Sequence, residues 1–226
     1  MKTKIIAFFL AACSLFLASC GHKGEMTENG FVDPNTGIEY VQVTPMGLYP
    51  IDPEEEFITV KEGERETVYY TVWFEQSSRF LCYESEGYYF LMRASTVKEP
   101  TVSEFNPIAA FIYNSSNTVK VDNFFADSEY IPEYQQDDMT DGETELCRVV
   151  ADAITNGEAV EVSVTREDVE SLFYIRLLSR DYPGLYYIVS FFGYNGRYFL
   201  RDDTSHKTVY CPYDIIVRMV GSGETV

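Results

Sequence analysis

The sequence predicts an α+β protein, with an antiparallel β-rich N-terminal part followed by a C-terminal part made of helix, strand, helix and hairpin. Three observations lead to this fold class. Apolar residues make up 46% and aromatic residues 15% of the 226 residues, which is enough for a packed core. Residues 40–125 alternate short aromatic and β-branched runs with turn residues, and helical spacing of apolar residues begins only after residue 143.

The β-rich part, residues 40–125, contains six short runs typical of strands. They are separated by clusters of Pro, Gly, Ser and Asn, which favours antiparallel hairpins. A short helix is expected to start near Thr101 or Ser103, and Pro107 limits its length. The six expected strands are 40–43, 67–74, 79–83, 88–93, 109–113 and 118–121.

The C-terminal part, residues 143–221, starts with apolar residues at helical spacing from Leu146 to Ile154, and Asn156-Gly157 supplies a stop. A strand over 159–164 and a second helix from Thr165 to about Asp181 are expected next, the helix because Asp168 completes a capping box. Strands over 185–193 and 197–202, joined at Asn195-Gly196, and two more over 208–211 and 215–220 complete this part.

An acidic linker, residues 126–142, is predicted between the two parts and is broken by Pro132. It does not fit a calcium-binding loop starting at Asp137. Met139 and Arg148 would stand at the third and twelfth positions, where oxygen ligands are needed.

Residues 1–19 have the pattern of a secretory signal, with Lys2 and Lys4 ahead of an uncharged apolar run. The run is too short to span a bilayer. The residues that follow it, Leu17-Ala18-Ser19-Cys20, resemble the lipobox of bacterial lipoproteins. The resemblance implies that Cys20 receives the lipid and becomes the first residue after cleavage, with an ordinary cleaved signal as the alternative. Residues 20–39 are then expected to form a flexible tether of about 25 Å.

The resulting expectation is a protein anchored by its N-terminal lipid to a bacterial membrane and facing outside the cytoplasm. Removal of Lys2 and Lys4 with the signal changes the net charge from −19 to −21. Such an acidic chain repels phosphate backbones and anionic lipid headgroups, which argues against nucleic-acid binding. Buried acyl chains can still hold such a protein at the membrane.

Three cysteines remain besides Cys20: Cys82, Cys147 and Cys211. They allow at most one disulfide within the chain. Cys82 and Cys211 both fall in strand-like runs, so they form the favoured pair if a bridge exists. The alternative is three buried thiols that pack as small apolar side chains.

Residues 149–200 resemble a module that precedes the catalytic core in some exported bacterial transglutaminase-like proteins. The resemblance rests on the Asn156-Gly157 stop and on the turn from Asp181 through Pro183 and Leu185 to Tyr187. Only about 25 residues follow, too few for that family's Cys, His and Asp core. The resemblance therefore implies an accessory or binding module and transfers no catalytic residue.

No catalytic, metal or cofactor motif is present in the sequence, and neither a metal site nor a cofactor is predicted. We consider two hypotheses. The first is a non-enzymatic binding or structural module that contacts an envelope protein or glycan through exposed tyrosines, with Tyr186, Tyr187, Tyr194 and Tyr198 as candidates. The second is a small envelope hydrolase or thiol enzyme that uses Cys211 with His206, oriented by Asp214.

Overall fold

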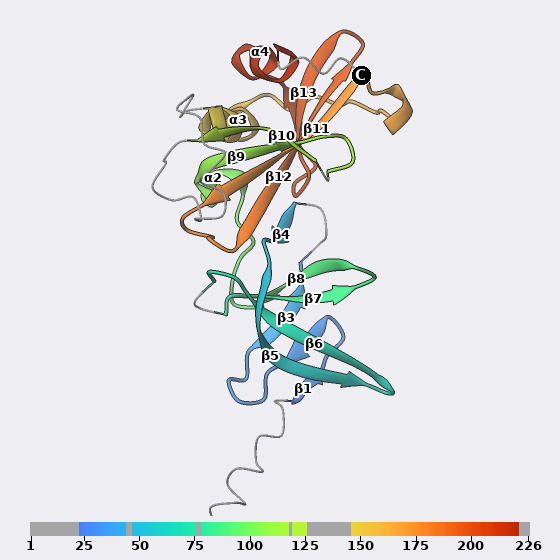
Figure 1. The fold of residues 1–226 in the computed structure, drawn as a ribbon, viewed down its shortest axis with the longest axis vertical. Helices are drawn as coiled ribbons and strands as arrows, with labels where there is room; N and C mark the ends of the chain where they lie inside the picture. The colour runs from blue at the N-terminus through green and yellow to red at the C-terminus, as the bar shows by residue number, and fades with distance from the viewer. Residues whose placement is uncertain (1–22, 44–46, 76–77, 118, 126–145, 222–226) are drawn as a thin grey trace, which may run out of the picture.

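The computed structural model describes residues 23–43, 47–75, 78–117, 119–125 and 146–221. The protein is β-rich, with 49% of these described residues in strands and few helices, one of them near the C-terminus, so the predicted α+β class holds only in part. Figure 1 shows two parts stacked along the long axis, a barrel formed by the first part of the chain and a sheet with helices formed by the rest.

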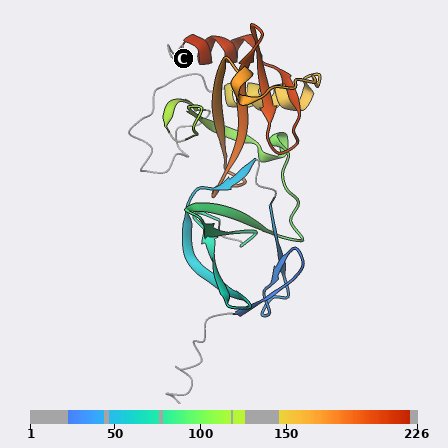
Figure 2. The ribbon, with the colours of Figure 1, turned by 90° about the vertical axis from the view of Figure 1, so that its right-hand side faces the viewer.

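The N-terminal part is a closed barrel of seven strands in the order β1-β2-β3-β8-β7-β6-β5. Neighbours pair antiparallel except β1 and β5, whose parallel pairing closes the ring that Figure 2 shows end to end with the sheet part. The strands are β1 (Lys23–Met26), β2 (Gly30–Val32), β3 (Glu39–Gln42), β5 (Pro53–Glu62), β6 (Arg65–Val72), β7 (Phe80–Ser85) and β8 (Tyr88–Ala94).

The expectation of a flexible tether over residues 20–39 is wrong from Lys23 onward. Strands β1 and β2 and the start of β3 lie in this stretch, and Phe31 of β2 is fully buried in the barrel. Strands of three or four residues flanked by turn residues lack the length that marks a strand in sequence. The boundary between the two parts also differs from the expected position, because the barrel ends at Ala94. The predicted acidic linker, 126–142, falls outside the described residues.

The C-terminal part contains a sheet in the order β10-β9-β11-β12-β13-β14, and β4 pairs with β12 beside this path. All its described pairs are antiparallel. The hairpin predicted at Asn195-Gly196 is confirmed, and both residues have the positive φ values of a type I′ turn, 51° and 67°. The strands are β4 (Leu48–Pro50), β9 (Pro107–Tyr113), β10 (Lys120–Phe125), β11 (Ser171–Ser179), β12 (Leu185–Tyr194), β13 (Arg197–Asp202) and β14 (Thr208–Tyr210).

Three helices accompany this sheet in the described part: α2 (Val102–Phe105), α3 (Leu146–Asn156) and α4 (Tyr213–Gly221). The short helix near Thr101 and the helix from Leu146 are both confirmed. In α3, five residues on one side are buried against the sheet: Leu146, Cys147, Val150, Ala151 and Ile154.

Three other expectations for the C-terminal part are wrong. The second helix is a short 3₁₀ turn, Arg166–Asp168, followed by strand β11. One face of β11 carries the buried Phe173, Ile175 and Leu177, and Leu172 and Leu178 lie on the other face, so the apolar spacing of this segment also matches a helix. Residues 159–164 form no strand. Residues 215–220 belong to α4, because Ile215 and Met219, one helical turn apart, are the positions that enter the core.

One hydrophobic cluster spans the junction of the two parts. Val72, Phe80 and Cys82 of the barrel belong to the same buried cluster as α3 and the inner face of the C-terminal sheet, whereas a second cluster around Phe31 and Tyr69 fills the barrel. At this junction the Arg79 guanidinium binds the Glu75 carboxylate through two hydrogen bonds, of 3.1 and 2.9 Å, and donates a third to a backbone carbonyl at Asp181. We infer that barrel and sheet form a single structural unit.

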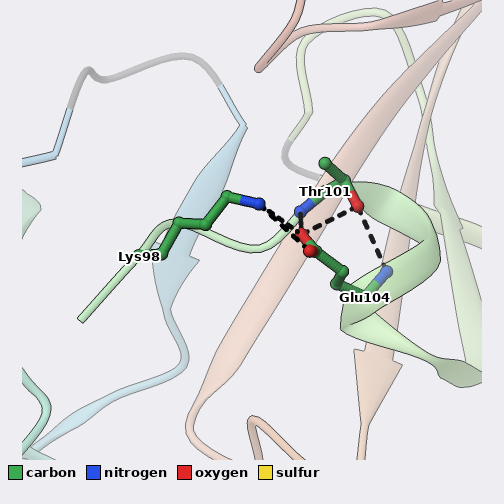
Figure 3. Close-up of polar contacts among 3 residues, drawn as sticks. All are labelled: Lys98, Thr101 and Glu104. Carbon is green, nitrogen blue, oxygen red and sulfur yellow. Dashed lines mark hydrogen bonds and ion pairs between the residues drawn. The ribbon is translucent and has the colours of Figure 1, made fainter.

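The segment between β8 and α2 is fixed by a capping box, drawn in Figure 3. The Glu104 amide donates to the Thr101 hydroxyl, and the Glu104 carboxylate accepts from the Thr101 amide, at 2.9 Å, and from the Lys98 ammonium, at 3.0 Å. These bonds, led by the Thr101 amide, lower the pKa of Glu104 to about 2. The three residues have a structural role, which is to start α2 where the chain leaves the barrel.

Two hairpin turns, one joining β2 to β3 and one joining β13 to β14, share the same design. The first residue, Asp33 or Asp202, accepts hydrogen bonds from the amide two residues on, at 3.0 and 2.9 Å, and from the hydroxyl three residues on. The fifth position has a positive φ in both, 70° at Gly37 and 60° at His206. His206 therefore holds a conformation in which glycine is preferred.

Candidate functional site

The barrel interior is filled by aromatic side chains over most of its length. Phe31 stacks on Tyr40 at 5.2 Å between ring centroids and contacts Tyr69 at 4.3 Å. Tyr83 continues this column, 5.4 Å from Tyr69 and 5.4 Å from Phe90. The Tyr40 hydroxyl ends the column by donating to the backbone carbonyl of Ser78. A packed interior of this kind leaves no room for a long apolar ligand along the barrel axis.

An open pocket of about 490 Å³ lies beyond this column at one end of the barrel. Its volume is in the range of small-molecule sites, and barrel mouths are a common place for such sites. All seven barrel strands and the turn between β1 and β2 contribute residues to its lining. The lining residues are Met26, Thr27, Glu28, Asn29, Gly30, Val41, Gln42, Val60, Glu62, Arg65, Thr67, Tyr69, Tyr83 and Met92.

The β5–β6 hairpin produces a gradient from apolar to charged along one wall. Side chains two residues apart on a strand share a face, so Tyr69, Thr67 and Arg65 follow one another on β6. Their partners on β5 are Ile58, Val60 and Glu62. The three cross-strand pairs change from aromatic and aliphatic in the core, through Val60 and Thr67, to Glu62 and Arg65 at the opening.

Arg65 places a positive charge close to two phenol groups. Burial raises the pKa of Tyr69 to about 12, with a further increase from Tyr83, and Arg65 acts in the opposite direction. Burial also raises the pKa of Tyr83, and Arg65 again opposes it. Both phenols are therefore neutral at physiological pH and retain a proton to donate. Among the described residues, neither Arg65 nor Glu62 forms an ion pair with another side chain.

The turn between β1 and β2 forms the adjoining wall, because β1 pairs with β5. The Thr27 amide donates to the Gly30 carbonyl at 2.9 Å, and a Cβ at Gly30 would lie 1.9 Å from the Tyr40 carbonyl oxygen, so only glycine fits there. The Thr27 hydroxyl oxygen is buried without a hydrogen-bond partner among the residues described.

The tyrosines proposed from the sequence do not form one exposed surface. Tyr186 and Tyr187 are neighbours on β12, so their side chains lie on opposite faces, and both are buried. The Tyr187 hydroxyl donates to Asp202 at 2.9 Å inside the core. Tyr194 and Tyr198 are half-buried, and Tyr198 stacks on Phe191. The proposed interaction surface at these four residues is therefore not present.

The three cysteines Cys82, Cys147 and Cys211 are free and buried, so the favoured disulfide between Cys82 and Cys211 is not formed. Burial raises the pKa of Cys82, to about 12, and also that of Cys211. A nucleophilic thiol needs a lowered pKa and access to substrate. His206 lies in the β13–β14 turn and Asp214 on the exposed side of α4, and the structure gives the thiol-enzyme hypothesis no support.

Within the described ranges, no group of three His, Cys, Asp or Glu side chains is arranged to hold a metal ion. None of the helices described is long and apolar enough to cross a membrane. Comparison with protein-family models, with curated proteins and with solved structures gave no match. The barrel mouth is thus the candidate site that the geometry itself supports.

Sequence reasoning missed the barrel mouth. Part of its lining comes from β1, whose residues were expected to belong to a flexible tether. Another part comes from β5, where no strand was expected. The alternation of Arg65, Thr67 and Tyr69 could have indicated the barrel mouth. These residues share one face of the strand, and if the aromatic Tyr69 faces the interior, the polar Arg65 and Thr67 face the interior as well.

Proposed function

We propose that this protein is a non-enzymatic binding module, exported and held at a bacterial membrane by a lipid on Cys20, that binds a small polar ligand in the barrel mouth. The observation that carries the binding proposal is the pocket of about 490 Å³ at the end of an otherwise packed barrel, with hydroxyl, amide and charged groups around an apolar floor. Sites for small molecules combine these elements.

The anchor and the pocket are close along the chain. β1 starts at Lys23, three residues after Cys20, and three peptide units reach about 11 Å when extended. This distance replaces the expected tether of about 25 Å. A lipid on Cys20 would therefore hold the barrel almost directly at the membrane surface.

The location is tested with Cys20→Ala. We expect this variant to fold normally and to be found in the soluble extracytoplasmic fraction, because no other feature of this acidic chain favours an anionic bilayer. Immunoblots of fractionated cells measure the change. Membrane retention of the variant equal to that of the wild type would contradict the anchor.

The binding site is tested by thermal unfolding with a library of amino acids, short peptides, sugars and phospholipid headgroups. A ligand at 100 times its dissociation constant stabilises by about 2.7 kcal/mol, which corresponds to roughly 5–10 °C in Tm for a protein of this size. In Thr67→Trp the new side chain fills the pocket, so we expect the shift to be lost.

Glu66→Trp is the matched control, because Glu66 is the adjacent residue on β6 and does not line the pocket. Its ligand-induced shift should equal that of the wild type. A library without any stabilising compound, or a shift that Thr67→Trp preserves, would contradict binding at the barrel mouth.

A further inference from the structure

The charged groups at the barrel mouth define the chemistry of the ligand more narrowly. We propose, on the basis of the binding function proposed above, that the ligand is a zwitterion with an ammonium group and an anionic group separated by a short chain. Arg65 binds the anionic group, and Glu62 and Glu28 bind the ammonium group.

The first argument is the presence of both signs of charge around one opening. Arg65 and Glu62 are paired residues at the end of the β5–β6 hairpin, and Glu28 lies in the β1–β2 turn on the adjoining wall. Arg65 and Glu62 are exposed and, within the part of the chain described, form no ion pair with side chains of the protein. Their charges remain available to a ligand, and charge-assisted hydrogen bonds are the strongest polar contacts it can form.

The second argument comes from the charge of the whole chain. A net charge of −19 repels a ligand that carries only negative charge, although Arg65 could bind it locally. Two carboxylates and one guanidinium also leave the lining with a net negative charge. A zwitterion avoids the long-range repulsion because its net charge is zero, and it satisfies both kinds of group at the mouth.

The third argument is the order of the lining from the rim to the floor. The charged residues are at the rim, whereas Val60, Met92 and the ring of Tyr69 lie deeper. Thr67 and Gln42 supply hydrogen-bonding groups between these levels. This order suits a molecule whose charged ends stay at the opening while a small apolar group enters the pocket. A short peptide with free termini has the two charged groups and a small apolar side chain, and the phosphoethanolamine headgroup has the two charged groups.

Isothermal titration calorimetry with two probes separates these sources: the tripeptide Ala-Ala-Ala and glycerophosphoethanolamine. We expect one of them to bind the full-length protein. N-acetylation of that probe should weaken binding about tenfold, since it removes the ammonium group. Arg65→Gln should weaken binding of the unmodified probe by a similar factor, and Glu62→Gln by a smaller one because Glu28 remains.

Glu64→Gln is the control, because Glu64 lies in the same hairpin turn and does not line the pocket. It should leave the affinity unchanged, and far-UV circular dichroism verifies that the variants fold. Binding of the peptide alone or the headgroup alone identifies the source.

Two results overturn the inference. One is that neither probe binds at millimolar concentration. The other is that a probe binds with an affinity that N-acetylation and Arg65→Gln leave unchanged. The proposed function fails separately, when no compound of the library produces a shift that Thr67→Trp removes. A neutral sugar that binds the wild type but not Thr67→Trp would retain the function and reject the zwitterion.

Discussion

The ion pair at the junction of the two parts gives a prediction that can be worked through from the structure. The Glu75 side chain is 2% exposed, and its partner Arg79 is 35% exposed. Removing one partner of a fully buried pair costs about 3–5 kcal/mol, whereas an exposed pair contributes about 0–1 kcal/mol. Because Arg79 keeps contact with water and with a carbonyl at Asp181, we expect Glu75→Ala to destabilise the protein by about 2 kcal/mol.

The assay is thermal and urea-induced unfolding of Glu75→Ala, Arg79→Met and the double variant. A loss of about 2 kcal/mol corresponds to roughly 4–8 °C in Tm for a protein of this size. The double-variant cycle should give a coupling energy of about 1.5 kcal/mol, because both side chains act through the same two hydrogen bonds. Lys98→Met, which removes a more exposed partner, should have a smaller effect. A coupling energy below about 0.5 kcal/mol would refute the conclusion that Glu75 and Arg79 stabilise the protein as a pair.

Three further predictions concern groups outside the barrel mouth. Burial raises the pKa of Asp203 to about 6, above its unfolded value of about 3.9, so stability should increase as pH falls from 7 to 4. Asp203→Asn should raise the free energy of unfolding at pH 7 by up to about 2–3 kcal/mol, measured by urea unfolding, and have little effect at pH 4. Equal effects at both pH values would contradict this. Gly37 and His206 both have a positive φ. In urea unfolding, His206→Gly should therefore stabilise the protein by about 0.5–1 kcal/mol, and Gly37→Ala should destabilise it. A destabilised His206→Gly would show that the histidine side chain contributes more to stability than its backbone strain costs. Three cysteines are buried: Cys82, Cys147 and Cys211. In the native protein, iodoacetamide should label them much more slowly than it labels a free model thiol, as measured by mass spectrometry. Rapid labelling of any of the three would contradict their burial.

The parts of the fold that the sequence predicted are those with a local cause. The Asn195-Gly196 turn needs two positive φ values, and the α3 pattern needs one buried side, so each can be recognised within a few residues. β11 could not be assigned in this way, because Leu172 and Leu178 add apolar residues to the alternation of Phe173, Ile175 and Leu177, and the resulting spacing matches a helix as well as a strand. β5 was missed because its first half, Pro53-Glu54-Glu55-Glu56, has the composition of a loop.

The candidate site depended on a contact that no local pattern contains. The lining depends on the parallel pairing of β1 with β5, which brings the β1–β2 turn beside the β5–β6 hairpin at the same end of the barrel. The tyrosines chosen from the sequence failed for a related reason. Adjacent residues such as Tyr186 and Tyr187 lie on opposite faces of a strand, so their proximity in sequence does not bring them to one surface.

The central claim, that the barrel mouth binds a ligand, is tested most directly by NMR of ¹³C-methyl methionine. Met26 and Met92 line the pocket, whereas Met219 is buried in α4 at the other end of the molecule. The most stabilising compound of the library is added in steps, and the three signals are assigned by single Met→Leu variants. We predict that the Met26 and Met92 signals shift with one common dissociation constant while that of Met219 stays in place. Unchanged Met26 and Met92 signals at saturating ligand would contradict the account.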